Sequence, residues 1–324
     1  MKLQILVPQY KETDEIIKPL LDSIAMQQCI DFKQVGVIIC NDGTDVRLSD
    51  NLLGSYPFKI EYYLCEHRGV SATRNECLDH AIADYVMFCD SDDMFSDMCG
   101  LYAVFEKIDK YFDTLVSAFI EEAKHDPTGE MYLVKHEHDS TFVHGKVHRR
   151  QYLTENNIRF NDALTIHEDS YFNILCQSLT ENVAYIETPF YLWKWRDNSI
   201  CRRDPKYMLK TYSNMIDSVD ALIEALTLMG EPNKAIYHVL AFLFDTYYTM
   251  QKPEWKDPEN IAFREATEKR FAEYYAKWKD TWLKVKPQEK VKISEDVRGR
   301  NIEKGMLIET ITVDDWLKAI EENI

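Results

Sequence analysis

The stretch YVMFCDSDD, residues 85–93, runs from five mostly apolar residues directly into Asp90, Asp92 and Asp93. Carboxylate oxygens spaced this closely on a turn can hold a hard divalent cation such as Mg²⁺ or Mn²⁺, and the remaining positions of the cation can take phosphate oxygens from a substrate. Asp is also favoured at the start of a helix, where it pairs with free backbone N–H groups. The motif alone is therefore compatible with either a metal site or a helix cap.

A second candidate group lies in HRGVSATRN, residues 67–75. Gly69 allows the backbone to approach a ligand closely, and Arg74 is suited to contact a diphosphate or a base edge. An isolated Arg on a helix is more commonly an ordinary surface residue, so this motif gains weight only beside others.

Two later segments carry complementary chemistry. HEDSYF, residues 167–172, places Glu168 and Asp169 before an expected helix, where a carboxylate could accept the proton of a substrate hydroxyl or simply cap the helix. WRDNSICRR, residues 195–203, brings Arg196 and Ser199 into a basic patch of an acidic chain. That patch suits a loop that closes over a leaving phosphate, and it is equally consistent with a solvated charged loop.

A group of histidines resembles a zinc site at first sight, because His136, His138, His144 and His148 are close in the sequence. No HExxH motif occurs and no Cys joins them, so we predict surface histidines. The chain also has no GxxxxGK[ST] and no GxGxxG, which excludes P-loop phosphate binding and the usual dinucleotide fingerprint.

Alternating strands and helices must position these groups. Apolar runs predict strands at 3–8, 35–40, 58–64 and 85–89, and helical spacing predicts helices at 16–24 and 70–83. This alternation indicates a parallel sheet covered on both faces, with ligands beyond the carboxyl ends of the strands. Because Tyr10, Asp42 and Asp90 each follow one of these strands, we expect them to converge.

The rest of the chain is less regular. Residues 114–195 mix expected strands at 114–120, 131–134 and 142–145 with expected helices at 149–157 and 168–179. After about residue 205 helical spacing dominates, at 206–229, 232–251 and 258–283. The highly charged residues 284–305 are expected to form a surface connection, followed by a short helix at 312–322.

Composition bounds the class of protein. The 324 residues are 45% hydrophobic and 12% aromatic, which is enough for a packed core. The net charge is −17, with most of the excess acid before residue 206, and this argues against nucleic acid as the main partner. No apolar run approaches the roughly 20 residues that span a bilayer, and the first residues are expected to form a strand rather than a signal peptide. Eight Cys without a CxxC pair indicate reduced, buried thiols and a cytoplasmic location.

The segments VPQY, ICNDGT, GVSATRNECLDHA, YVMFCDSDD, HGKVHRRQYL, IRF, HEDSYF and WRDNSI occur in the order seen in family 2 glycosyltransferases of the GT-A fold. The resemblance covers residues 1–203, about two thirds of the chain. It implies an α/β domain at 1–205, with a Rossmann-like, mostly parallel central sheet and helices on both faces, followed by a helical C-terminal extension at 206–324. It also implies inverting transfer of a sugar from a nucleotide-sugar, commonly UDP-linked, to a glycan or other acceptor hydroxyl.

The same resemblance carries roles over to matching residues. A carboxylate base is implied at Asp169, supported by Glu168. A divalent cation, Mn²⁺ or Mg²⁺, is implied at Asp92 together with Asp90. Contacts to the nucleotide-sugar are implied at Pro8, Tyr10, Glu12, Asp42, Arg74, Asp90, Ser91, Arg196 and Ser199, with Asp42 at the uracil edge and the last two residues at the pyrophosphate.

Three positions depart from the family's pattern. Lys11 stands where Asn is usual, Asn41 where Asp is common, and Thr73 where a small residue precedes the Arg. The acids needed for metal, nucleotide and base are all present, which favours an active enzyme.

Two alternatives stay open from the sequence. One is a nucleotide-sugar-binding protein without turnover. The other is a sugar-phosphate nucleotidyltransferase, although PQYKETDE stands where that class usually has a Gly-rich, basic loop after its first strand. The helices after residue 205 are expected to shape the acceptor site or a homo-oligomer contact. A peripheral position at the inner face of a membrane is compatible with the expected cytoplasmic location.

Overall fold

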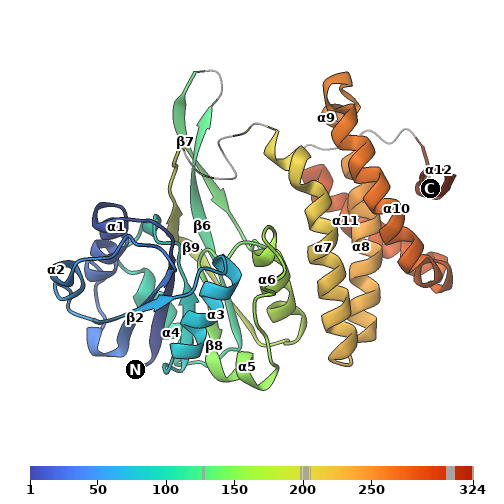
Figure 1. Ribbon diagram of the computed structural model, residues 1–324. Helices are drawn as coiled ribbons and strands as arrows, with labels where there is room; N and C mark the ends of the chain where they lie inside the picture. Colours follow the sequence, from blue (N-terminus) through green and yellow to red (C-terminus); the bar gives the residue numbers. More distant parts are fainter. Residues whose placement is uncertain (126–127, 198, 200–203, 205, 304–310, 323–324) are drawn as a thin grey trace. The chain divides into compact units, whose positions relative to one another are not determined.

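The computed structural model describes the chain except for residues 126–127, 198, 200–203, 205, 304–310 and 323–324, and the side chains of 300–303 are also left undescribed (Figure 1). The chain divides into two units, Met1–Asp197 and Asn198–Ile324. The first unit is built on a sheet, whereas every regular element described in the second is a helix.

The sheet of the first unit has nine strands in the order β3-β2-β1-β4-β8-β6-β9-β5, with β7 paired to β6. The strands are β1 Leu3–Gln9, β2 Val35–Asp42, β3 Lys59–Cys65, β4 Tyr85–Phe88, β5 Met94–Phe95, β6 Thr114–His125, β7 Glu130–His136, β8 Lys146–Arg149 and β9 Val183–Trp193. Strands β3, β2, β1 and β4 are parallel, as are β6 and β9, whereas β8 is antiparallel to both of its neighbours. The hairpin of β6 and β7 extends beyond the other strands (Figure 1). The predicted α/β class is confirmed.

Helices cover both faces of this sheet. They are α1 Asp14–Ala25, α2 Asp50–Leu53, α3 Val70–His80, α4 Gly100–Ile108, α5 Arg150–Glu155 and α6 Glu168–Ser178. Alternate residues of β1, including Ile5, pack with α1 and α4 in one hydrophobic core. On the other face, Phe88 of β4 meets Phe172 of α6 edge-on, with ring centres 5.6 Å apart. Burial on both faces explains why the strands are continuous apolar runs in the sequence.

Local signals explain where the helices next to the site begin. Helix α1 starts after Thr13 and carries Asp14 and Glu15 in its first turn, where carboxylates favour the helix start. Helix α3 starts after Gly69, whose φ of 91° is open to glycine and strained for other residues. Both helices begin a few residues after a parallel strand ends, so short loops line the carboxyl edge of the sheet.

One strand prediction is wrong. Residues 142–145 form a turn, and β8 begins only at Lys146. Gly145 has a φ of 66°, and a Cβ on it would lie 2.3 Å from the Ser117 Oγ, so the tight approach of this turn to β6 depends on glycine.

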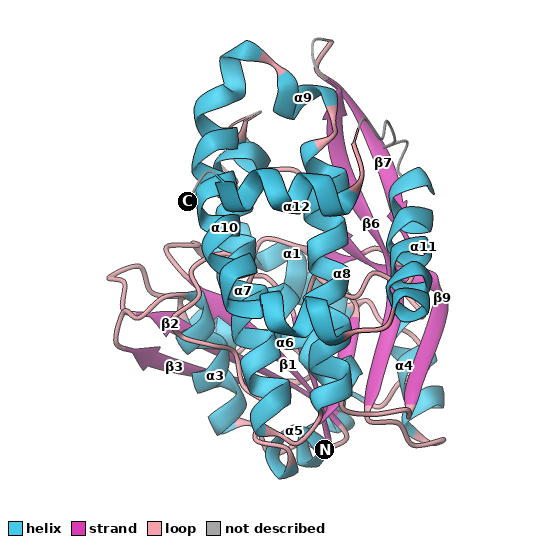
Figure 2. Cartoon of the chain, turned by 90° about the vertical axis from the view of Figure 1, so that its right-hand side faces the viewer, coloured by secondary structure: helices cyan, strands magenta, loops and turns pink. Residues whose placement is uncertain are grey.

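The second unit is a set of packed helices (Figure 2). They are α7 Tyr207–Leu228, α8 Pro232–Met250, α9 Pro253–Lys256, α10 Ile261–Lys284, α11 Pro287–Glu303 and α12 Val313–Glu322. Helix α8 packs against α7, α10 and α11, and it buries Val239, Leu240 and Leu243. Among the described helices, none combines the length and the apolar composition needed to cross a bilayer.

Helix α11 corrects the expectation of a surface connection at 284–305. Although its composition is highly charged, this helix is partly buried, and its Val297 is 1% exposed. The Tyr237 hydroxyl of α8 also donates to Asp296 at 2.7 Å, and the Tyr248 and Ser294 hydroxyls lie 3.1 Å apart. One fully buried valine, supported by such polar pairs, is too weak a pattern to stand out in the sequence.

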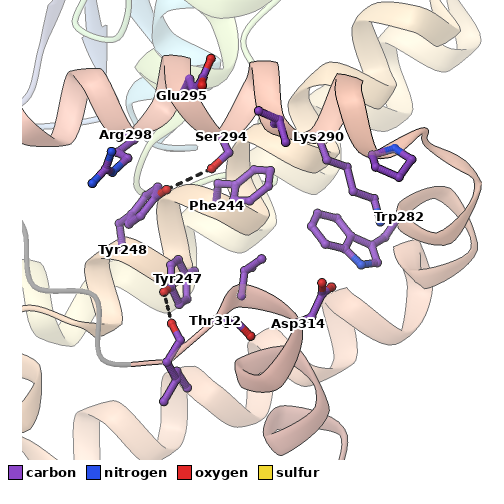
Figure 3. Close-up of a pocket in the computed structure, with 14 residues that line it drawn as sticks. Phe244, Tyr247, Tyr248, Trp282, Lys290, Ser294, Glu295, Arg298, Thr312 and Asp314 are labelled. Carbon is purple, nitrogen blue, oxygen red and sulfur yellow. Dashed lines mark hydrogen bonds between the residues drawn. The ribbon is translucent and has the colours of Figure 1, made fainter.

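A cavity of about 800 Å³ lies within the second unit (Figure 3). Its lining includes the aromatic side chains of Phe244, Tyr247, Tyr248 and Trp282. The Lys290 ammonium lies 3.8 Å from the centre of the Trp282 ring, so a cation already covers one face of that ring.

We expect Gly100→Ala to destabilise the first unit by about 1–3 kcal/mol, because a Cβ at this position would lie 2.4 Å from the Cβ of Phe190 in a packed core. Urea unfolding followed by near-UV circular dichroism measures the change. The control is Gly299→Ala in α11, where a Cβ meets no atom within 4 Å, and it should be neutral or stabilising by up to about 1 kcal/mol. Equal stability of Gly100→Ala and the wild type would contradict this packing.

Candidate active site

A buried arginine connects two distant parts of the first unit. Arg74 of α3 is 3% exposed, and its guanidinium lies 5.2 Å from the centre of the Phe160 ring. One terminal nitrogen donates to Glu168 Oε1 at 2.9 Å and to Asp169 Oδ1 at 2.5 Å. The other donates to Asp90 Oδ1 at 3.0 Å. Arg74 therefore joins the turn after β4 to the first residues of α6.

Burial and charge oppose each other in this cluster. Burial alone would lower the pKa of Arg74, but Asp169, Asp90 and Glu168 outweigh it and raise that pKa. Burial raises the pKa of Asp169 to about 6, and Arg74 limits the rise. Burial likewise raises the pKa of Asp90, again opposed by Arg74. Asp169 can therefore exchange a proton near neutral pH, which its ordinary pKa of 3.8 would not allow.

The start of α6 is fixed by its neighbours. His167 precedes the helix with φ 62° and ψ 19°, a left-handed conformation that is uncommon outside glycine and is often found at functional sites. One turn later, the buried Asn173 side chain donates to the carbonyls of Asp169 and Thr141, each at 2.9 Å. These bonds hold the predicted base, Asp169, in one place relative to the sheet.

The three acids after β4 have different partners. Asp93 is 1% exposed, and its two oxygens accept hydrogen bonds from the Tyr191 hydroxyl at 2.6 Å and from the Lys194 backbone N–H at 2.9 Å. Asp92 is half-buried and accepts from Arg196 at 2.5 Å. Asp93 therefore ties the turn to the end of β9, whereas Asp92 faces a cationic side chain that a ligand could replace.

Glu12 completes a second charged group with Asp92 and Arg196. The Arg196 guanidinium lies 3.8 Å from Glu12 Oε1, and the other Glu12 oxygen accepts from the Tyr10 backbone N–H at 2.6 Å. Burial raises the pKa of Glu12, and the nearby Asp92 adds to the rise. Ser91, within the same turn, is buried. The structure thus brings together four of the residues predicted to contact a nucleotide-sugar or a metal.

A further set is compatible with a divalent cation. Asp90, Asp93 and His144 each place one ligand atom within 4.8 Å of the others. His144 is 2% exposed, and among the described residues its Nδ1 has no hydrogen-bond partner, the nearest acid being Asp93 Oδ2 at 3.9 Å. Burial lowers the pKa of His144 to about 3, so the imidazole is neutral and its nitrogen lone pair is free to ligate.

The expectation of surface histidines is wrong for His144 and His148, which are both buried. His148 lies in β8, between β4 and β6, and its ring meets Phe172 edge-on. His144 lies in the turn just before β8 and stacks between Phe142 and Tyr191. Both histidines therefore lie in the interior of the first unit, although composition alone would assign them to the surface.

The end of β2 supports a different wall of the site. Asp42 is 4% exposed and accepts hydrogen bonds from the Arg68 and Gly69 backbone N–H groups and a contact from His67 Nδ1 at 2.9 Å. It therefore anchors the turn that starts α3. The Tyr10 and His67 rings stack 5.0 Å apart, the Lys11 ammonium lies 4.7 Å from the centre of the Tyr10 ring, and Tyr10 is 44% exposed. A planar base could stack on this ring by displacing Lys11. The predicted contacts of Tyr10 to the nucleotide and of Asp42 to uracil stay predictions.

Two further predicted residues are Pro8 and Ser199. Pro8 is half-buried in β1, opposite Cys40 of β2. Ser199 belongs to the second unit and lies between the undescribed residues 198 and 200. The predicted roles of Pro8 and Ser199 stay predictions.

Sequence reasoning missed the contributions of Asp93, His144 and Tyr191. Asp93 follows the predicted acids directly, but nothing local distinguishes an inward carboxylate from an outward one. Tyr191 lies in the apolar run of β9, where a buried hydroxyl gives no pattern. The pairing of β6 with β8 and β9, together with that of β5 with β9, brings these three residues together.

Known proteins resemble this chain in both sequence and structure. A family model described as "Glycosyl transferase family 2" matches residues 4–177, more than half of the chain. Glycosyltransferase GlyA of Streptococcus pneumoniae serotype 4 is 24% identical over 256 residues, which cover 71% of this chain and 35% of that protein. A poly(ribitol-phosphate) beta-glucosyltransferase of Bacillus spizizenii is 22% identical over 305 residues, covering 89% of this chain and 46% of that protein. The chain thus spans about a third and about half of the length of these two relatives.

Solved structures share the fold. S. aureus TarS 1–349 superposes with a TM-score of 0.63 at 16% identity, covering 95% of this chain and 93% of that one. The same TarS fragment in complex with UDP-GlcNAc gives a TM-score of 0.57 over the same shares.

We expect Arg74→Met to cost about 3–5 kcal/mol at pH 7, because it leaves three carboxylates without their shared cation. Without Arg74, nothing opposes the rise that burial causes in the pKa values of Asp90 and Asp169. Their protonated forms then fit the fold better, so stability should recover as the pH falls toward about 5. Thermal unfolding across this pH range measures both effects.

The control for this substitution is Arg68→Met. Arg68 is half exposed and pairs with Glu76 at the surface, so its loss should cost less than about 1 kcal/mol at any of these pH values. If Arg74→Met were as stable as Arg68→Met at pH 7, the buried cluster would not make the expected contribution to folding stability.

Proposed function

We propose that this chain, which belongs to glycosyl transferase family 2, is a glycosyltransferase. In this proposal it transfers a sugar from a UDP-linked donor to an acceptor hydroxyl with inversion at the anomeric carbon. The observation that carries this proposal is the buried Arg74, which holds Asp90 and Asp169 in one charged cluster. A group for the diphosphate end of the donor and a candidate base are thereby tied to the same side chain.

The choice of a UDP-linked donor has two supports. TarS, which shares the fold, is known in complexes with UDP and with UDP-GlcNAc. In this chain the Tyr10 ring lies at the end of β1, beside the turn that Asp42 anchors, and a base could stack on it in place of the Lys11 ammonium. We propose that Tyr10 stacks on the uracil, with Asp42 at its edge, and that Arg196 contacts the pyrophosphate. Pro8, Glu12, Ser91 and Ser199 are proposed to complete the same pocket.

Asp169 is the proposed general base. An acceptor hydroxyl is a poor nucleophile until a carboxylate takes its proton as the sugar carbon is attacked. With its pKa raised to about 6, Asp169 is mostly ionised at pH 7 and is a stronger base than an ordinary aspartate. Glu168 shares one nitrogen of Arg74 with Asp169, and we assign it the role of orienting that arginine and the base.

A single displacement accounts for the remaining chemistry. Attack from the face opposite the diphosphate inverts the anomeric carbon and needs no covalent nucleophile. Negative charge grows on the departing diphosphate, and Arg196 can stabilise it by turning from Asp92 to the phosphate oxygens.

A bound divalent cation would supply further positive charge at the leaving diphosphate. We propose Asp92 and Asp90 as its ligands, because the Asp92 carboxylate is half-buried and faces only the displaceable Arg196 and Glu12 group, whereas both Asp93 oxygens are engaged. The alternative set, Asp90 with Asp93 and His144, is supported by the unpartnered Nδ1 of His144.

The acceptor and the second unit are also part of the proposal. The acceptor is a hydroxyl of a glycan or of another compound, and residues 206–324 are assigned to acceptor binding or a homo-oligomer contact. The cysteines among the described residues are all free, which favours a reducing compartment such as the cytoplasm, with a peripheral position at a membrane compatible with it.

We expect Asp169→Asn to lower turnover of UDP-sugars by about 10²- to 10⁴-fold while UDP affinity changes by less than about twofold. Slow hydrolysis, in which water replaces the acceptor, provides the assay before the acceptor is known. In the wild type kcat/KM should rise with pH and reach half of its plateau near pH 6, since the base must be ionised. The Asn variant should lose this dependence.

Asp162→Asn is the control for this experiment, because Asp162 is exposed and lies on the loop before α6. It should retain wild-type turnover and the same pH profile. Full activity of Asp169→Asn would assign the base to another residue. UDP binding by the wild type without any turnover would favour the binding-protein alternative.

The two cation sets differ in one measurable way. We expect Asp92→Asn to weaken Mn²⁺ binding, measured by electron paramagnetic resonance in the presence of UDP, by at least about tenfold, and His144→Gln to leave it within about threefold. The reverse order would move the cation to Asp90, Asp93 and His144. An imidazole ligand would then also favour Mn²⁺ over Mg²⁺, which prefers oxygen.

A further inference from the structure

Carboxylates from two elements hold the segment that leaves β9. The Lys194 backbone N–H donates to Asp93 Oδ1 at 2.9 Å, and the next N–H, of Trp195, donates to Glu122 Oε2 at 2.8 Å. The following residue, Arg196, reaches Asp92 at 2.5 Å. Two consecutive backbone groups are therefore fixed immediately before the arginine.

Strand β6 supplies a second contact to this segment. The Lys124 ammonium lies 5.8 Å from the centre of the Trp195 ring and 3.6 Å from Asp197 Oδ1. The Trp195 indole N–H donates to the same Asp197 oxygen at 2.9 Å. Residues 122 and 124 point to one side of β6 because side chains alternate along a strand, so the segment lies along that side.

We propose that Glu122 and Lys124 are positioning residues that act through Trp195 and Asp197 to hold the Arg196 guanidinium beside the carboxylates of the donor site. This inference rests on the proposed function and names the element that positions its diphosphate contact. The β6–β7 hairpin thereby has a role in ordering the loop that follows β9.

The physical reason is the length of the arginine side chain. A guanidinium on several rotatable bonds can meet a diphosphate productively only if its backbone is already placed, since ordering both at once costs conformational entropy. A bond to the N–H directly before Arg196 removes much of that freedom in advance. The carboxylate of Glu122 suits this task because a charged acceptor strengthens a hydrogen bond to a backbone N–H.

The neighbouring residue provides a matched control. Glu121 precedes Glu122 in β6, points to the opposite side of the strand, and lies 2.8 Å from His136 Nε2 of β7. Removing either carboxylate changes the same strand by the same number of atoms. The Glu122 change removes the acceptor of the Trp195 backbone N–H, whereas the Glu121 change leaves that bond in place.

The test compares Glu122→Ala, Glu122→Gln and Glu121→Ala in the whole 324-residue chain, using UDP with MnCl₂ as the probe in calorimetric titrations. We expect Glu122→Ala to weaken UDP binding by about three- to tenfold, as for the loss of one hydrogen bond. Glu122→Gln should stay within about twofold, because its side-chain oxygen can still accept the Trp195 N–H. Glu121→Ala should bind UDP as the wild type does.

A double-mutant cycle separates positioning from general stability. In an Arg196→Ala background, Glu122→Ala should weaken UDP binding by little more, because its effect passes through the missing side chain. Equal weakening with and without Arg196 would overturn the proposal. So would equal effects of Glu122→Ala and Glu121→Ala.

Hydrogen exchange of the Trp195 amide, measured without nucleotide, gives an independent readout. It should be faster in Glu122→Ala and unchanged in Glu121→Ala, and a wild-type rate in Glu122→Ala would contradict the positioning role. If the wild type did not bind UDP, the proposed function would fail, and these exchange rates would still decide the role of Glu122.

Discussion

The guanidinium of Arg74 is almost fully buried at a point where three carboxylates converge on it. Each of these acids would be costly to keep ionised in such a place alone, and the arginine would be costly without them. Together they hold the turn after β4 against the start of α6, two segments about eighty residues apart in the chain. For Asp169, Arg74 offsets the effect of burial only in part, so the pKa of this carboxyl stays raised to about 6. The raised pKa makes Asp169 suitable as a base.

The DSDD turn shows how neighbouring residues of one type acquire different tasks. Asp93 points inward and is engaged by Tyr191 and Lys194, so it joins the turn to β9. Asp90 points to Arg74, and Asp92 points to Arg196. Asp93 therefore supports the turn from within, whereas Asp90 and Asp92 face the charged groups of the site. A substitution at Asp93 would disturb the site through its supports, whereas one at Asp92 removes a contact available to a ligand.

The sequence predicts the parts of this site that depend on local order. Parallel strands end at a common edge, so the positions of Asp42, Asp90 and the residues after β1 followed from the apolar runs before them. The pairing of Arg74 with Asp169 did not, because it depends on how α6 packs, and no local pattern encodes that distance.

The same limit applies to His144 and Glu122. His144 is buried because the turn before β8 packs against Phe119 of β6 and Tyr191 of β9, and Glu122 acts because β6 runs beside the end of β9. Both facts arise from strand order, which was not predicted from the sequence. In α11 the failure had another cause, since a charged helix with one buried valine resembles a solvated loop in composition.

The cavity and the charged side chains suited to sugar transfer belong to different units of this protein. The cavity of about 800 Å³ lies among aromatic residues of the second unit, and Lys290 already covers one face of its Trp282 ring. The converging acids, the buried arginine and the raised pKa of Asp169 lie in the first unit instead. Sugar transfer requires charge placed where charge will develop, and such groups attract each other closely when no ligand separates them. The contacts of Arg196 with Asp92 and Glu12 are of this kind, so a tightly closed cluster of opposite charges is a better guide to the reacting centre here than open space.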